Sequence, residues 1–243
     1  MKKIQKLSKN KNWNKFIGDI WLEVITNINI SKKSIIVELA PGKENKIGLG
    51  LSKYGFKGEI YLVEPNKRAL TYIARQYRKE LPSAKIFTLP LKLKDAIPLL
   101  PKKVDAIVSN HPLDDLLVGK FLGSNFGEYF DKIYNTPDMK TRYFWKEILR
   151  RPKKIKSAKK QIINEFLKLI KRTSPSFVAI SQYKSYLFQT NMMKEPDEQA
   201  FGILKKLRAL FISKERKDII YSIKDIKEKE RWLILDHPIS ELD

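Results

Sequence analysis

A short turn directly after a buried apolar run is the first place where residue types suggest ligand binding. The run ends with Glu38 and Leu39, and Ala40, Pro41 and Gly42 follow. Small residues and a glycine at a strand end let a ligand approach the backbone, and a carboxylate just inside can accept hydrogen bonds from ligand hydroxyl or ammonium groups. On its own, this pattern is also that of an ordinary tight turn.

A second carboxylate stands at the end of the next apolar run. Glu64 closes this run and Pro65 follows it. In a doubly wound sheet, an acid roughly 20 residues after the first turn can accept from both ribose hydroxyls of a nucleoside. Together with the turn at Pro41 and Gly42, Glu64 therefore indicates a ligand site.

A third strand end combines Asn110 with a proline two residues later. The Asn110 side-chain carbonyl can accept from an exocyclic amine. The backbone carbonyl of His111 can accept too, because Pro112 has no N–H, and Leu113 can line the face of a base. The alternative is a strand-end cap with a proline that ends the sheet.

Two aspartates follow this third strand end. Asp114 and Asp115 could accept protons there, but their position favours capping of a helix that begins at Leu116.

Short apolar runs alternate with segments of helical periodicity along the chain. The predicted strands span 34–39, 59–64, 84–89, 104–109, 176–181, 217–223 and 231–235. The predicted helices span 13–28, 47–54 (ended by Gly55), 65–80, 157–172 (capped by Ser157) and 196–211. This order predicts one α/β domain over residues 1–243, with a mostly parallel seven-stranded sheet, helices on both faces and a C-terminal antiparallel hairpin.

The charge of the chain is strongly positive. Its 49 lysines and arginines outnumber 27 acidic residues, which gives a net charge of +22. Such a surface favours a polyanion, because phosphate contacts release counterions. Nucleic acid is therefore the expected partner, although some proteomes are lysine-rich throughout.

Composition also excludes several kinds of chemistry. The chain has no cysteine, and His111 and His237 are its only histidines. Disulfides, thiol nucleophiles and cysteine-based zinc sites are excluded, and no metal is expected. Without a leader-like N-terminus or a long apolar stretch, we expect a cytoplasmic protein that does not enter a membrane.

Half of the excess charge lies in residues 140–172, within a predicted basic insertion at about 123–172. Residues 140–172 contain 13 basic side chains but only Glu147 and Glu165 as acids. The expected nucleic-acid contacts are Arg142, Lys146, Arg150, Arg151, Lys153, Lys154 and Lys156. The aromatic residues 143–145 could stack on bases, or they could form the buried side of a short helix with Ile148.

Taken together, the three strand ends resemble class I S-adenosylmethionine-dependent methyltransferases, nearest to the ribosomal RNA adenine dimethyltransferases. The stretch 38–42 is similar to the family's Glu-Ile-Gly-Pro-Gly, the pair 63–64 to its Val-Glu, and 110–113 to its Asn-Leu-Pro-Tyr. The resemblance covers about residues 30–122 and implies a Rossmann-like fold.

The resemblance implies S-adenosylmethionine as cofactor and methyl transfer to RNA, for instance to a base amine. Cofactor contacts are then expected from Glu38, Ala40, Pro41, Gly42, Glu64, Pro65, Leu89 and Asn110. Catalytic contacts are expected from Asn110, Pro112 and Leu113.

The chain departs from the family at three points. Glu44 replaces a second glycine, the third strand ends without its adenine-binding acid, and Leu113 replaces the aromatic residue that stacks on the target base. Two alternatives follow: a non-catalytic nucleic-acid-binding protein on a decayed methyltransferase fold, and a small-molecule methyltransferase. A nicotinamide dehydrogenase is disfavoured, because the chain lacks Gly-x-Gly-x-x-Gly.

Overall fold

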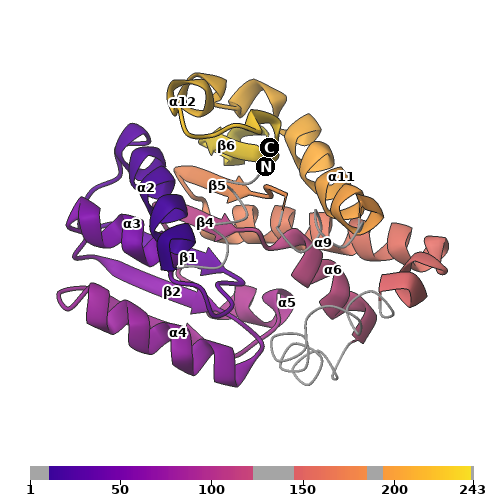
Figure 1. Ribbon diagram of the computed structural model, residues 1–243, viewed down its shortest axis with the longest axis horizontal. Coiled ribbons are helices and arrows are strands. Elements are labelled where there is room, and N and C mark those ends of the chain that lie inside the picture. The colour runs from indigo at the N-terminus through magenta and orange to yellow at the C-terminus, as the bar shows by residue number, and fades with distance from the viewer. Residues whose placement is uncertain (1–10, 123–144, 185–193, 242–243) are drawn as a thin grey trace.

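The computed structural model describes residues 11–122, 145–184 and 194–241 (Figure 1). The strands are β1 (Ile35–Leu39), β2 (Glu59–Val63), β3 (Lys85–Leu89), β4 (Ala106–Asn110), β5 (Phe177–Ser181) and β6 (Trp232–Asp236). The helices are α2 (Lys11–Asn27), α3 (Lys46–Tyr54), α4 (Lys67–Glu80), α5 (Leu93–Ala96), α6 (Leu113–Leu122), α9 (Pro152–Thr173), α11 (Lys194–Leu210) and α12 (Lys217–Ser222). As the sequence predicts, Gly55 ends α3 in the left-handed conformation, with φ 75°.

The strands form one six-stranded sheet in the order β3-β2-β1-β4-β5-β6. Strands β1 to β5 are parallel, and β6 runs antiparallel to β5 (Figure 1). The carboxyl ends of the parallel strands therefore meet at one edge. The strand order reverses between β1 and β4, and ligands of α/β sheets bind outside the strand ends at such a reversal.

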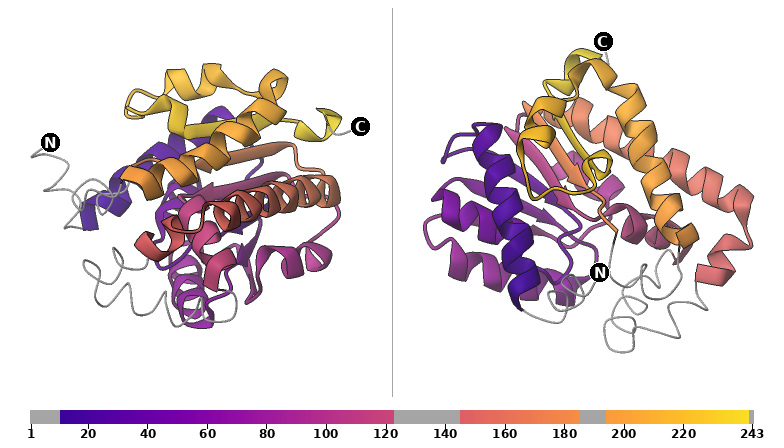
Figure 2. Two further views of the ribbon diagram at one scale, coloured as in Figure 1. Left: turned by 90° about the vertical axis from the view of Figure 1, so that its right-hand side faces the viewer. Right: turned by 45° about the horizontal axis from the view of Figure 1, so that its top comes forward.

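Alternating side chains of the strands contribute to two separate apolar cores. On one face, which we call the α6 face, Leu39, Val63 and Ile107 pack under α5, α6, α9 and α11. On the other, the α2 face, Ile36, Leu62 and Val108 pack under α2, α3, α4 and α12. Both faces of the parallel strands are thus buried under helices (Figure 2), as expected for strands covered by crossover helices.

The predicted seventh strand is wrong. Residues 217–223 form α12 and its C-terminal end, so the sheet has six strands, and the predicted C-terminal antiparallel pair is formed by β5 and β6. Ile219, Ile220 and Ile223 are all buried on one side, while Tyr221 is exposed. That spacing is helical, but isoleucine is β-branched and favours strands, which led to the prediction of a strand.

Two predicted helix starts are also wrong. Helix α9 begins at Pro152, because proline suits the first helical position and Ile155 already belongs to the buried side, so Ser157 lies inside the helix. Helix α6 begins at Leu113 rather than Leu116, which places Asp114 inside its first turn.

Candidate functional site

The turn after β1 has the backbone conformation expected for close ligand approach. Ala40 and Gly42 both have positive φ, 48° and 60°. A non-glycine residue rarely adopts this conformation, and such strain gathers at functional sites. The Ala40 N–H donates to the Val63 carbonyl at 2.9 Å and so ties this turn to the end of β2.

Glu64 lies next to this turn and is only 2% exposed. Its carboxylate accepts from the Gly42 N–H at 3.4 Å and the Asn66 N–H at 2.9 Å. Burial raises the pKa of Glu64 to about 7, and the two backbone donors oppose this shift. Glu64 therefore titrates near neutral pH.

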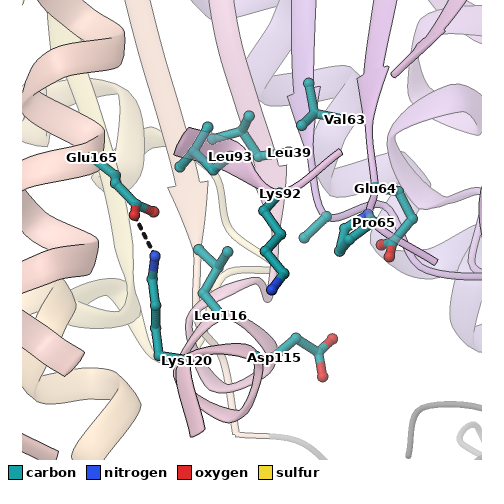
Figure 3. A pocket seen from close by; sticks show the side chains of 12 residues that line it. Leu39, Val63, Glu64, Pro65, Lys92, Leu93, Asp115, Leu116, Lys120 and Glu165 are labelled. Atoms are coloured by element: carbon teal, nitrogen blue, oxygen red, sulfur yellow. Dashed lines mark hydrogen bonds and ion pairs between the residues drawn. The ribbon is translucent and has the colours of Figure 1, made fainter. Parts of the chain in front are cut away.

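Glu64 also lines a pocket that is open to solvent at the carboxyl edge of the α6 face (Figure 3). The lining residues are Leu39, Ala40, Val63, Glu64, Pro65, Lys92, Leu93, Asp115, Leu116, Gly119, Lys120 and Glu165. Small-molecule sites commonly combine apolar walls with a few polar groups. The lining of this pocket, which is mostly apolar with a few charged side chains, is of that kind.

Glu38 lies on the opposite face of the sheet. It is 1% exposed and accepts a hydrogen bond from the Tyr77 hydroxyl in the core of the α2 face. Burial raises the pKa of Glu38 to about 8, although the Tyr77 hydrogen bond lowers it. Pro41, Gly42, Leu89 and Asn110 are likewise not among the residues that line the pocket.

Asn110, at the end of β4, is held by three side chains. Its Oδ1 accepts from the Trp21 indole N–H at 2.9 Å and the Ser181 hydroxyl at 3.2 Å. An indole N–H can only donate, so the amide nitrogen must face Tyr183, whose hydroxyl oxygen lies 3.1 Å away. The amide of Asn110 is thus fixed in one orientation.

Lys46 reaches the same tyrosine from the first turn of α3. It is 4% exposed, donates to the Tyr183 hydroxyl oxygen at 2.8 Å and forms an ion pair with Glu44. Burial alone would lower the pKa of Lys46, but Tyr183 and Glu44 raise it above its ordinary value. We call Trp21, Lys46, Asn110, Ser181 and Tyr183 the β4–β5 cluster.

The loop after β4 carries the remaining predicted residues. His111 has φ 60° and its N–H donates to the Ser181 carbonyl at 2.8 Å. Pro112 is buried, and Leu113 is 0% exposed and packs in the core of the α6 face. The backbone of this loop is therefore at the edge, while the side chain of Leu113 points inward.

Two neighbouring aspartates in this loop differ in their environment. Asp114 pairs with His111 at 3.1 Å; despite burial, this contact lowers the pKa of Asp114 and raises that of His111. Burial, and then the charges of Asp114, Glu64 and Glu44, raise the pKa of Asp115 well above its usual range.

The basic side chains just before α9 and in its first turns are exposed. Lys146, Arg150, Arg151, Lys153, Lys154 and Lys156 are all exposed, whereas Arg142 lies outside the described residues. Trp145 and Ile148 are buried in the α6-face core, which agrees with the alternative of a buried helical side; residues 143 and 144 are not described. Glu147 pairs with Arg150, and Glu165 pairs with Lys120.

Several residues at the edge were not anticipated from the sequence. Lys46, Tyr183 and Trp21 enter the site only through contacts between distant segments, and Lys92 lines the pocket just after β3. Glu44 was noted as a departure from a glycine motif, and its ion pair with Lys46 two residues later was the one local signal available.

No protein-family model and no curated protein matches the chain. Among solved structures, a proposed S-adenosyl-L-methionine-dependent methyltransferase of Methanococcus maripaludis is 14% identical with a TM-score of 0.46, covering 97% of this chain and 90% of that one. An S-adenosylmethionine-dependent methyltransferase of Aquifex aeolicus is 15% identical with a TM-score of 0.41, covering 76% and 75%.

The bifunctional kinase-methyltransferase WbdD is 9% identical with a TM-score of 0.41, covering 73% of this chain. The chain spans only 30% of the length of WbdD. At such identities these likenesses concern the fold alone, and none of the three proteins is described as a ribosomal RNA adenine dimethyltransferase.

Among the residues that the structure describes, no helix is both long and apolar enough to cross a membrane. In the same residues, no cluster of three or more histidine, aspartate or glutamate side chains is arranged to hold a metal ion.

Proposed function

We propose that the chain is an S-adenosylmethionine-dependent methyltransferase and that the α6-face pocket binds the cofactor. The observation that carries this proposal is Glu64, a buried carboxylate at the end of β2 that lines a largely apolar pocket. Adenosine offers an apolar base and two ribose hydroxyls that donate to a carboxylate. The pocket's lining fits both parts.

In this proposal Glu64 holds the ribose and Pro65 lies against the base. The turn of Ala40, Pro41 and Gly42 gives the ligand access to the backbone, while Glu38 and Leu89 support the ends of β1 and β3 from within. The bound cofactor supplies a methyl group already activated on a sulfonium. The chain's own task is then to align the acceptor and exclude water.

The acceptor site in this proposal is the edge formed by Asn110 and the backbone at Pro112 and Leu113. The Asn110 Oδ1 accepts two hydrogen bonds within the protein, and the Ser181 contact is the longer, at 3.2 Å. A serine hydroxyl rotates freely, so an exocyclic amine could replace it and be held for attack.

Calorimetric titration with S-adenosylhomocysteine tests the cofactor proposal. Glu64→Ala should weaken binding by about 1.5–3 kcal/mol, the range for a hydrogen bond to a charged group. Glu59→Ala, at the opposite end of the same strand, is the matched control and should leave the dissociation constant unchanged. Equal affinities of the folded wild type and Glu64→Ala would remove Glu64 from the site.

We further propose RNA as the substrate and the exposed start of α9 as its platform. Both acids of residues 145–172 are paired, so most of the 11 basic side chains there lack an acidic partner among the described residues. Unpaired neighbouring cations repel one another, and a phosphate backbone relieves that repulsion.

Salt dependence of RNA binding tests the platform. Each phosphate contact to a single strand contributes a slope of about 0.7, so replacing Arg150, Arg151, Lys153 and Lys154 with Ala should flatten the slope by up to about 3. The matched control replaces Lys33, Lys57, Lys102 and Lys103, which are exposed near the amino ends of the strands. Coinciding slopes of the α9 variant and the wild type would make the segment a solvated basic surface.

A non-catalytic nucleic-acid-binding protein on the same fold is the second candidate. It is favoured by the side chain of Leu113, which is buried in the core, and by Asn110, whose amide groups all have partners within the protein. RNA binding together with no heat of binding at millimolar S-adenosylhomocysteine would support this candidate over the methyltransferase.

A further inference from the structure

Asp115 lines the pocket but has no role in the ribose and base contacts proposed above. It lies in the first turn of α6 and lines the pocket with Glu64. Figure 3 shows the carboxyl groups of Asp115 and Glu64 at the same end of the pocket, away from Leu39 and Leu93. Within the described part of the chain, Asp115 forms no hydrogen bond and no ion pair.

The neighbouring Asp114 shows that this lack of a partner is specific to position 115. Asp114 is bound by His111 and by the Gln182 amide, at 3.1 and 3.2 Å. A partly buried carboxyl group without any partner is costly, because it has lost water without gaining hydrogen bonds. A ligand group that compensates this cost would therefore bind favourably at Asp115.

The charges around Asp115 indicate the sign of that ligand group. The acidic groups that act on it are Asp114 beside it in α6, Glu64 directly after β2, and Glu44 shortly before α3. Two of the nearby lysines are already paired, Lys46 with Glu44 and Lys120 with Glu165. Lys92 lines the pocket but forms no ion pair with either Asp115 or Glu64 in the described residues. Among the described residues that line the pocket, the two carboxyl groups of Glu64 and Asp115 are therefore accompanied by one unpaired cation, Lys92.

We propose that Asp115 distinguishes the positively charged sulfonium of the methyl donor from the neutral thioether of its product. This inference rests on the proposed function and deepens it. Sulfur is joined to the ribose through one carbon, so a ligand whose ribose is held by Glu64 has its charge close to the ribose, in the pocket that Asp115 also lines. After transfer that charge is gone, and the product is held less tightly than the donor.

Titrations with two stable ligands test this inference. Sinefungin carries an ammonium group where the donor has its methyl sulfonium, whereas S-adenosylhomocysteine is neutral at that point. The wild type should prefer sinefungin, and Asp115→Asn should reduce this preference by about tenfold, the size of a contact to a charged group. The affinity of Asp115→Asn for S-adenosylhomocysteine should remain close to that of the wild type.

Asp95→Asn, on α5 and half exposed, is the matched control and should keep the preference. Asp115→Glu should keep most of it, and thermal unfolding of each variant checks the fold. An unchanged preference in folded Asp115→Asn, or equal weakening of both ligands, would overturn the role of Asp115 while leaving the cofactor pocket intact. If neither ligand binds the wild type at millimolar concentration, that result would contradict the proposed function itself and therefore also this inference.

Discussion

At the carboxyl edge, the two faces of the sheet differ in whether their polar side chains are bound by other side chains. On the α2 face, Glu38 is bound by Tyr77, and each member of the β4–β5 cluster is bound by another, as in the Asn110–Tyr183 contact. On the α6 face, Glu64 receives only backbone donors and Asp115 has no partner among the described residues. Buried polar groups that are fully satisfied stabilise a fold, whereas unsatisfied ones at a pocket are available to a ligand.

From this contrast we expect Glu38 to affect the stability of the fold rather than ligand binding. Its pKa is about 8 in the folded protein, above the ordinary 4.5, so the folded state holds a proton that the unfolded state releases. Its contribution is therefore fully present below about pH 4.5 and is lost as the pH rises through about 8. At about 1.4 kcal/mol per pKa unit, the loss is roughly 3–5 kcal/mol.

Glu38→Gln should remove most of this pH dependence. Urea unfolding between pH 5 and 9 should give a flatter stability profile for the variant, with its largest advantage over the wild type at pH 9. Parallel profiles for the two proteins would mean that Glu38 is charged and accommodated in the core.

The same contrast predicts that Asn110→Ala affects folding more than cofactor binding. The substitution leaves the Trp21 N–H and the Ser181 hydroxyl without their acceptor. Each orphaned buried group costs about 1–3 kcal/mol, so the free energy of unfolding should fall by about 2–6 kcal/mol. The affinity for S-adenosylhomocysteine should change less than about twofold, and turnover per bound complex should fall.

A collapse of cofactor affinity in Asn110→Ala, with the fold intact by circular dichroism, would contradict the separation of the two faces. It would place Asn110 in the cofactor site rather than in the acceptor site.

The smallest expected effect is the pH dependence of cofactor binding. The pKa of Glu64 is about 7, and ribose hydroxyls donate best to its ionised form. Below pH 7 binding must first remove a proton, so the affinity for S-adenosylhomocysteine should fall by up to about tenfold per pH unit. Above pH 7 it should level off. Glu64→Gln should bind more weakly and show a flatter profile between pH 5 and 7; a profile as steep as that of the wild type would assign the titration to another group.

The sequence is sufficient to predict the parts of the molecule that depend on local pattern. Five parallel strands and the turns at Gly42 and Gly55 follow from apolar runs and from residues that tolerate positive φ. For residues 217–223 the sequence predicts a strand, because three isoleucines favour a strand by type, while their spacing is helical. The single domain and the RNA substrate remain predictions.

The side-chain partners at the edge depend on contacts that local pattern does not contain. Lys46 and Tyr183 are 137 residues apart, and Trp21 and Asn110 are 89 apart. The sequence could place Asn110 at a strand end, but not show that its carbonyl is occupied. It could likewise mark Asp115 as a helix-start acid, but not as a pocket residue without a partner.

The most direct test of the account is a crystal structure with S-adenosylhomocysteine. The account predicts adenosine in the α6-face pocket, with both ribose hydroxyls within hydrogen-bond distance of Glu64 and the base against Pro65. Asp115 should lie beside the thioether sulfur. Adenosine bound on the α2 face near Lys46 and Tyr183, with the pocket at Glu64 empty, would contradict the central claim.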